Sequence, residues 1–232
     1  MNRFLVFLDR IGFPFFHFWV YVLLATATTS IATDDLILTE RMAKFVQRIY
    51  GSDAVKRLIE WQNLIKSNMN KIEKEKLTAV NDFFNHIPNV SDMDNWGKKD
   101  YWATPLELLA RNGGDCEDFA IAKYFTLRKL NVADKRLCLT YVRAYSGRKR
   151  LVIIPHLVLT YYPRPDGDPF VLDNLLPDIL PASQRRDLMP TYSFNGDGLW
   201  NSKERNRGKR IGSSKNIYPW QDLLTRIQEE GY

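Results

Sequence analysis

The sequence RNGGDCEDFAIAKYF at residues 111–125 joins a glycine turn to the start of a predicted apolar helix. Two glycines interrupt the preceding pattern, Asp115 is of a type that caps helices, and a run of apolar residues follows. Cys116 therefore falls in the first turn of a predicted buried helix, where unpaired N–H groups and the helix dipole favour a thiolate. The pattern fits a reactive cysteine, and it also fits a small core residue, since cysteine packs as a hydrophobe.

The composition suits one globular domain of moderate size, or one domain preceded by helices, because the chain has 232 residues of which 45% are hydrophobic. The chain holds 2 cysteines, too few for a disulfide scaffold or for a cysteine and histidine cluster that binds zinc. Any metal must therefore use oxygen ligands.

The N-terminal segment differs from the rest of the chain. Two arginines are followed by 23 uncharged residues, 11–33, and residues 30–32 fit a small-x-small cleavage site. We expect residues 1–32 to be a secretory signal that directs a single domain, 33–232, to the periplasm. A retained membrane anchor is the alternative, because the uncharged stretch is long enough to span a bilayer. Cleavage would delete two arginines and one aspartate, which lowers the formal charge from +6 to +5.

Basic residues are concentrated at 203–215, where six basic residues and one acid give a local charge of +5. Such a run can dock an acidic partner, or it can be a solvated loop rich in glycine, serine and asparagine. Nucleic-acid binding is disfavoured, because an exported protein rarely meets nucleic acid and no aromatic residues are interleaved with the run.

The order of patterns predicts an α+β fold. Apolar residues at three- and four-residue steps predict helices at about 36–50, 53–70 and 77–87, with a short helix from Thr104-Pro105. After Asn131 the periodicity changes to two, which predicts strands at 137–142, 151–162 and 170–172 in an antiparallel sheet against which the central helix packs.

Two further segments have a less regular pattern. The loop 89–104 is polar but carries Trp96, Tyr101 and Trp102, which can line the rim of a cleft or fill space between helices. From Pro177 onward turn residues dominate, and only 220–229 looks helical. We expect this part to wrap over the core in an ordered way, because it carries many large apolar residues: Leu188, Tyr192, Phe194 and Trp200.

Three residues together can supply nucleophilic catalysis. Cys116 begins a helix, His156 lies within the second predicted strand after Pro155, and Asp173 ends the third. Singly, His156 fits a buried core residue and Asp173 fits a turn cap. Together they give a nucleophile, a base and a carboxylate that orients the base. Pro155 removes a backbone donor and marks a strand edge or a bulge.

Several motifs resemble one family, the bacterial transglutaminase-like cysteine proteinases. The resemblance covers about residues 77–200, and these motifs carry it: Gly-Asp-Cys-Glu-Asp-Phe-Ala at 114–120, Pro-His-Leu-Val-Leu at 155–159, Val-Leu-Asp-Asn-Leu at 171–175, Asp-Tyr-Trp-Ala-Thr-Pro at 100–105, Pro-Ala-Ser-Gln-Arg-Arg at 181–186 and Tyr-Ser-Phe-Asn at 192–195. It implies a papain-like or transglutaminase-like fold, with N-terminal helices, a central helix that carries the cysteine, and an antiparallel sheet that carries the histidine and the aspartate.

The resemblance also implies a biological role. It implies a calcium-dependent endopeptidase that cuts the N-terminal periplasmic region of a large surface adhesin near paired small residues, which releases the adhesin and promotes biofilm dispersal. An inner-membrane receptor for cyclic-di-GMP is the expected inhibitory partner. Contact with the membrane is expected only through the signal segment or that receptor.

The acids around the cysteine give calcium a separate argument. Asp115, Glu117 and Asp118 surround Cys116, and three carboxylates oppose thiolate formation. A bound hard cation reverses that field, and the resemblance implies that these three residues are its ligands. The spacing is not that of an EF-hand, and an acidic helix start that satisfies the dipole is the alternative, with a stabilisation of ~0.3–1 kcal/mol per charge.

Three alternatives in chemistry remain open. The acyl-enzyme can be resolved by a lysine amine, as in a transglutaminase, or the scaffold can be a binding module without activity. A Cys116–Cys138 disulfide, possible in an oxidising compartment, would remove the nucleophile. A buried strand thiol is the expected state of Cys138.

Overall fold

The computed structural model describes residues 39–146, 152–202 and 208–230, which belong to one compact unit, Leu36–Tyr232. The predicted signal segment 1–32 lies outside the described residues. Within the described ranges, no helix combines the length and the apolar character that crossing a bilayer requires.

The helices follow the predicted patterns, and Gly51, with φ of +85°, ends the first and begins the second. Pro105 begins a short helix behind the cap Thr104, as expected. The loop predicted at 89–104 contains one helix that the sequence reasoning missed, α4. The helices are α1 Glu40–Tyr50, α2 Ser52–Asn68, α3 Glu73–Asn85, α4 Asp92–Trp96, α5 Pro105–Arg111, α6 Cys116–Lys129 and α7 Tyr218–Glu229.

The described residues form a seven-stranded antiparallel sheet in the order β4-β3-β2-β1-β5-β6-β7. The three predicted strands lie side by side as β1, β2 and β3. The strands are β1 Leu137–Ser146, β2 Val152–Tyr161, β3 Phe170–Leu172, β4 Leu180–Pro181, β5 Leu188–Phe194, β6 Leu199–Asn201 and β7 Lys209–Gly212.

The segment after Pro177 differs from the predicted wrap, because most of it extends the sheet. β5 pairs with the free side of β1, and β6 and β7 continue from it. β7 also takes up part of the basic run that we interpreted as a loop, while residues 203–207 of that run lie outside the described residues. The sequence signal was weak because Pro190 and a register shift interrupt β5, and β6 and β7 have only 3 and 4 residues.

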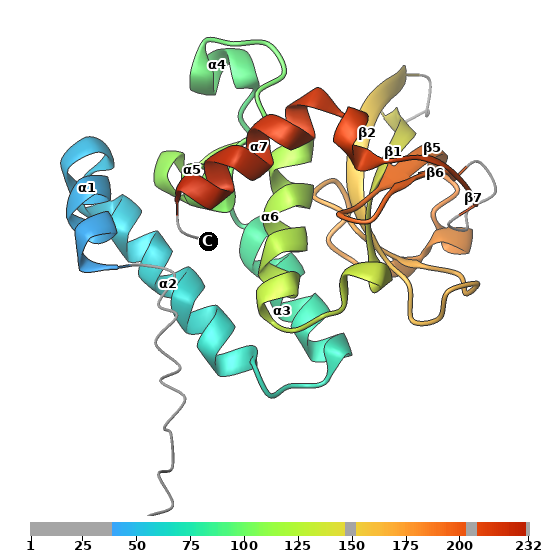
Figure 1. Ribbon diagram of the computed structural model, residues 1–232, viewed down its shortest axis with the longest axis horizontal. Helices are drawn as coiled ribbons and strands as arrows, with labels where there is room; N and C mark the ends of the chain where they lie inside the picture. The colour runs from blue at the N-terminus through green and yellow to red at the C-terminus, as the bar shows by residue number, and fades with distance from the viewer. Residues whose placement is uncertain (1–38, 147–151, 203–207, 231–232) are drawn as a thin grey trace, which may run out of the picture. The chain divides into compact units, whose positions relative to one another are not determined.

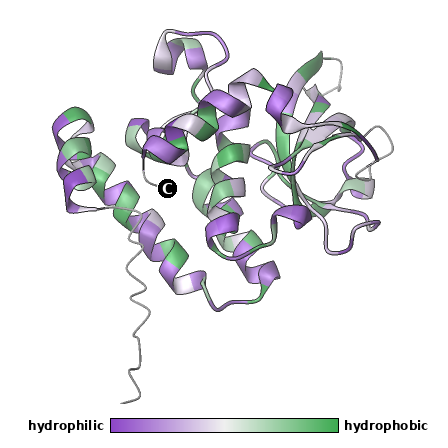
Figure 2. Ribbon diagram, in the orientation of Figure 1, coloured by the Kyte–Doolittle hydropathy of each residue, from purple (hydrophilic) through white to green (hydrophobic). Residues whose placement is uncertain are grey.

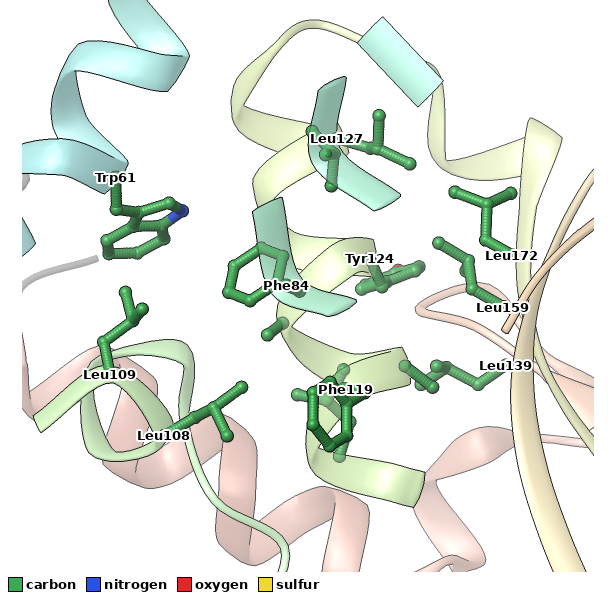
Figure 3. Close-up of a cluster of buried hydrophobic side chains, with 14 of the residues drawn as sticks. Trp61, Phe84, Leu108, Leu109, Phe119, Tyr124, Leu127, Leu139, Leu159 and Leu172 are labelled. Carbon is green, nitrogen blue, oxygen red and sulfur yellow. The ribbon is translucent and has the colours of Figure 1, made fainter. Parts of the chain in front are cut away.

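Helix α6 is the centre of the hydrophobic core. Figure 1 shows α6 beside β1 and β2, with α2 and α5 on its other side. Hydrophobic residues follow α6 and the inner strands in Figure 2. Side chains from both directions meet on α6 in Figure 3: Trp61, Phe84, Leu108 and Leu109 from the helices, and Leu139, Leu159 and Leu172 from the strands. Burial on both sides fixes the helix that begins with Cys116.

Candidate active site

The turn before α6 is held by close backbone packing. Asn112, with φ of +55°, ends α5 in the left-handed region. The N–H of Val90 donates to the carbonyl of Gly114 at 2.8 Å. A Cβ on Gly114 would lie 2.5 Å from Oδ2 of Asp118 and 2.6 Å from Cδ1 of Leu108. Glycine is therefore required here by the approach of side chains, and Asn112 supplies the backbone reversal.

Cys116 occupies the first position of α6, as predicted, and its sulfur is partly buried. The thiol donates to Oε2 of Glu117 at 3.0 Å, and the sulfur accepts a hydrogen bond from the backbone N–H of Leu157. Burial raises the pKa of the Cys116 thiol, and the charge of Glu117 and its hydrogen bond raise it further, against the effect of the Leu157 N–H. In this arrangement the protonated thiol is favoured, so the helix start alone does not activate the cysteine.

His156 and Asp173 are joined directly. Nε2 of His156 lies 2.7 Å from Oδ1 of Asp173, and both side chains are buried. Burial alone would raise the pKa of Asp173, but the hydrogen bond and charge of His156, the N–H of Leu175 and the charge of Arg185 hold it well below its usual value. The carboxylate is therefore ionised and can fix the orientation of the imidazole. The hydrogen bond places both side chains on one face of the sheet, as joint catalysis by His156 and Asp173 requires.

The sulfur lies beside the strand that carries the histidine. Leu157, whose N–H meets the sulfur, directly follows His156 in β2. Within β2, Leu159 to Tyr161 are the residues that pair with β3, so β2 extends past β3 at His156 and Pro155. The edge that Pro155 indicated is present, whereas the alternative, a bulge, is absent from the described β1–β2 pairing.

An acidic cluster lies on the other side of the cysteine. Carboxylate oxygens of Asp92, Asp115 and Asp118 lie within 4.8 Å of one another, and Asp115 and Glu117 form a second such group with Cys116. Burial raises the pKa of Asp92 to about 6, and burial with the neighbouring Glu117 raises the pKa of Asp115 to about 8. Within the described residues, the ion pairs of the structure include none of these acids.

Two oxygens of this cluster have the character of metal ligands. Oδ1 of Asp92 and Oδ1 of Asp115 are buried and make no hydrogen bond within the described residues. An orphaned buried carboxylate oxygen is costly unless a cation satisfies it. Asp118 differs, because Oδ1 accepts from the N–H of Ala103 at 2.7 Å and Oδ2 from the N–H of Asp115 at 3.2 Å. Asp118 therefore stabilises the turn through these two hydrogen bonds. The remaining lone pairs of its oxygens are available to a cation in the cluster.

Sequence reasoning missed Asp92 as a member of this cluster. Its other oxygen, Oδ2, accepts from the N–H of Tyr101, a contact within the loop 89–104. Asp92 follows Ser91, the residue that caps α4, so in sequence it resembles an ordinary acidic helix start. Long-range contacts bring this loop to the start of α6: the parallel bridge between Asn89 and Gly114, the hydrogen bond from Nδ2 of Asn95 to the carbonyl of Gly113, and the hydrogen bond from the N–H of Ala103 to Asp118. No local sequence pattern indicates these contacts.

The aromatic residues of that loop have divided roles. Trp102 is buried, and its ring stacks on Phe194 with centroids 5.9 Å apart. Trp96 and Tyr101 are only partly buried, with centroids 4.5 Å apart. Trp102 thus fills space in the core as one interpretation expected, and the other two remain accessible near the acidic cluster. The two cysteines of the chain form no disulfide, and Cys138 is buried in β1 as expected.

Comparison with known proteins gives a consistent result. The model of the family described as bacterial transglutaminase-like cysteine proteinase matches residues 55–195. The solved structure of Legionella pneumophila LapG is 40% identical over 81% of this chain and 96% of that chain, with a TM-score of 0.68. Its calcium-bound form is 39% identical over 80% and 98%, with a TM-score of 0.66. Its EGTA-treated form is 41% identical over 81% and 96%, with a TM-score of 0.70. A search of curated proteins gave no match.

Proposed function

Because the chain belongs to the bacterial transglutaminase-like cysteine proteinases, we propose that it is a calcium-dependent endopeptidase with Cys116, His156 and Asp173 as its catalytic residues. The observation that carries this assignment is the hydrogen bond of 2.7 Å between His156 and Asp173, next to the peptide whose N–H meets the Cys116 sulfur. The proposed nucleophile, base and orienting carboxylate thereby lie together beside the middle of β2.

The reaction follows from these positions. The Cys116 thiol loses its proton to the imidazole of His156, and the sulfur attacks the carbonyl carbon of the scissile peptide. The backbone N–H of Cys116, in the first turn of α6, is placed to stabilise the oxyanion. As the C–N bond breaks, the imidazolium gives its proton to the leaving amine, and water then hydrolyses the thioester. Asp173 stays ionised throughout and holds the ring in one tautomer.

Asp92, Asp115, Glu117 and Asp118 are the residues that would hold calcium. Carboxylate oxygens are the ligands that calcium prefers, and two of them here lack a hydrogen-bond partner in the part of the chain that the structure describes. A bound calcium supplies positive charge beside Cys116 and so favours the thiolate. In that state the carboxylate of Glu117 would be attracted to the cation and would no longer accept the hydrogen bond from the Cys116 thiol. That the related LapG has been solved both calcium-bound and EGTA-treated supports this assignment.

We extend the proposal to the biological setting that the family resemblance suggests. The substrate would be the N-terminal periplasmic region of a large surface adhesin, whose release promotes biofilm dispersal. The enzyme would act in the periplasm, after export by residues 1–32. An inner-membrane receptor for cyclic-di-GMP would sequester it.

The direct test is incubation of the purified protein with the N-terminal region of a large adhesin from the same genome. We expect new termini in calcium and none with chelator, and we expect Cys116→Ala to abolish cleavage. Cleavage that survives Cys116→Ala or chelation contradicts the proposal. Mass spectrometry distinguishes the acyl-transfer alternative, because isopeptide cross-links to lysine would replace new termini.

A matched pair of substitutions tests the metal assignment. Asp115→Asn removes one charge from the acidic cluster, whereas Asp94→Asn removes a charge from an exposed aspartate of α4 outside it. Calcium affinity, measured by isothermal titration calorimetry, should fall by at least tenfold for Asp115→Asn and stay near the wild-type value for Asp94→Asn. Equal affinities for the two variants would place the ion elsewhere.

A further inference from the structure

Arg185 is a buried arginine next to the proposed triad, only 2% exposed. It directly follows the short 3-10 helix Ala182–Gln184, and its N–H donates to the carbonyl of Ala182 at 3.1 Å. Its own carbonyl accepts from the N–H of Leu188 at 3.1 Å. Both hydrogen bonds fix the position of the Arg185 backbone, from which the side chain extends.

The guanidinium joins two carboxylates. Nε donates to Oδ1 of Asp187 at 3.0 Å, and Nη2 donates to Oδ2 of Asp187 at 2.8 Å. Nη2 also donates to Oδ2 of Asp173 at 2.6 Å. The bidentate contact with Asp187 sets the plane of the guanidinium, and that plane aims Nη2 at Asp173.

Asp173 is thereby held by both of its oxygens. Oδ2 accepts from Arg185, while Oδ1 accepts from His156 at 2.7 Å and from the N–H of Leu175 at 3.0 Å. Without Arg185, Oδ2 would have no donor in a buried site, and the carboxylate could rotate or take up a proton. Either change alters the contact with the imidazole.

The charges around Asp173 come from several elements. His156 lies on β2, and Lys123, on α6, interacts with the charge of Asp173. Arg185 and Asp187 lie in the turn before β5. The negative charges of Asp187 and Asp173 repel each other, and Arg185 compensates both at once. Its removal leaves these carboxylates to repel each other.

We infer that Arg185 is a positioning residue for the reaction: it holds one oxygen of Asp173 so that the other points at the ring of His156. The inference rests on the proposed catalytic roles of His156 and Asp173. It adds to the triad a fourth side chain that need not touch substrate.

The test compares Arg185→Gln with Arg186→Gln, which removes the same charge from the exposed neighbouring arginine. With an adhesin segment that the wild-type enzyme cleaves, kcat of Arg185→Gln should fall roughly 10- to 100-fold while KM stays within about twofold, since orientation is lost and substrate contacts are kept. Arg186→Gln should keep wild-type values. Circular dichroism and thermal unfolding establish that both variants are folded.

A second readout reports the hydrogen bond itself. The ring proton between His156 and Asp173 should give a far-downfield proton NMR signal, identified by its loss in Asp173→Asn. In Arg185→Gln this signal should shift or disappear, and in Arg186→Gln it should stay. His86→Gln excludes a contribution from His86, whose Nδ1 lies 2.6 Å from the carbonyl of Asp82.

The outcomes separate this inference from the proposed function. If Asp173→Asn abolishes cleavage while Arg185→Gln keeps both kcat and the NMR signal, the triad stands and the inference is wrong. If Asp173→Asn is fully active, the triad itself is wrong. If Arg185→Gln does not fold, Asp187→Asn replaces it, because it keeps the arginine and loosens its anchor; an unchanged kcat and signal in that variant overturn the inference.

Discussion

Replacing Lys123 by methionine should stabilise the protein at neutral pH, and the gain should shrink as the pH rises. Lys123 is 1% exposed in the middle of α6, and its Nζ donates to Oδ1 of Asn85 at 2.7 Å. Burial lowers the pKa of Lys123 to about 7, although the charges of Asp173 and Asp82 act in the opposite direction. An ammonium group is therefore costly at this position.

The sign and size of the effect follow from proton binding. In the unfolded chain Lys123 keeps its ordinary pKa of 10.5, whereas in the folded protein it loses its proton above about pH 7. Between these values the unfolded state binds more protons, so the stability of the wild type rises with pH. Each pH unit adds at most about 1.4 kcal/mol to the free energy of unfolding, and less near pH 7, where folded Lys123 is still partly protonated. The total between pH 7 and pH 9 is therefore about 2 kcal/mol. Lys123→Met removes this dependence.

The assay is urea unfolding of the wild type and of Lys123→Met at pH 7 and pH 9, in EDTA. Methionine also leaves Oδ1 of Asn85 without its donor, a cost of about 1 kcal/mol that does not vary with pH. The other titrating groups are common to both chains and cancel in the difference. The gap between variant and wild type should narrow by about 2 kcal/mol at the higher pH. A gap of equal size at both pH values would refute the reasoning, and Lys66→Met, at an exposed lysine of α2, is the control.

Three further outcomes are expected. Gly114→Ala should destabilise the fold by roughly 1–3 kcal/mol in urea unfolding, because its Cβ would lie 2.5 Å from Asp118 and 2.6 Å from Leu108. Trp61→Phe should cost about 1–2 kcal/mol in the same assay, because it removes the buried hydrogen bond of 2.8 Å from Nε1 to Thr126. Calcium at 100-fold above its Kd should raise the free energy of unfolding by about 2.7 kcal/mol, and an unchanged Tm would argue against a site in the folded state.

The helices other than α4, and the first three strands, could be predicted because their signals are local. Helix α2 shows its buried face in Leu58, Trp61 and Ile65, and β1 alternates apolar residues with others along one strand. The start of α6 is equally legible, since a glycine pair, a cap and an apolar run occur within one short stretch. Local periodicity is sufficient wherever an element buries one continuous face.

The later strands could not be predicted in the same way. β5 contains Pro190 and shifts register against β1 between Tyr141 and Val142, so its alternation is broken. β6 and β7 are each too short to show a period. Their stability comes from pairing with strands already in place, and that contribution is not encoded in a local pattern.

The site shows the same division between local and distant information. Asp115, Glu117 and Asp118 lie close to Cys116 in sequence and were found from it, whereas Asp92 and Arg185 reach the site through the tertiary fold. Arg185 falls in the motif Pro-Ala-Ser-Gln-Arg-Arg at 181–186, one of those that carry the family resemblance. Nothing in that motif distinguishes the buried Arg185 from its exposed neighbours Gln184 and Arg186.

Cys116 lies between two electrostatic systems with opposite effects. At β2, the imidazole of His156, held by an ionised Asp173, is the proposed acceptor of the thiol proton. On its own helical turn, Glu117 binds that same proton, and burial disfavours the thiolate. In the proposed mechanism the triad is therefore insufficient while the acidic cluster stays uncompensated. In the proposed mechanism Asp115 and Glu117 are the covalent neighbours of the nucleophile, so a cation that they bind would act on the sulfur directly. The calcium dependence would then follow from the position of these acids in the sequence.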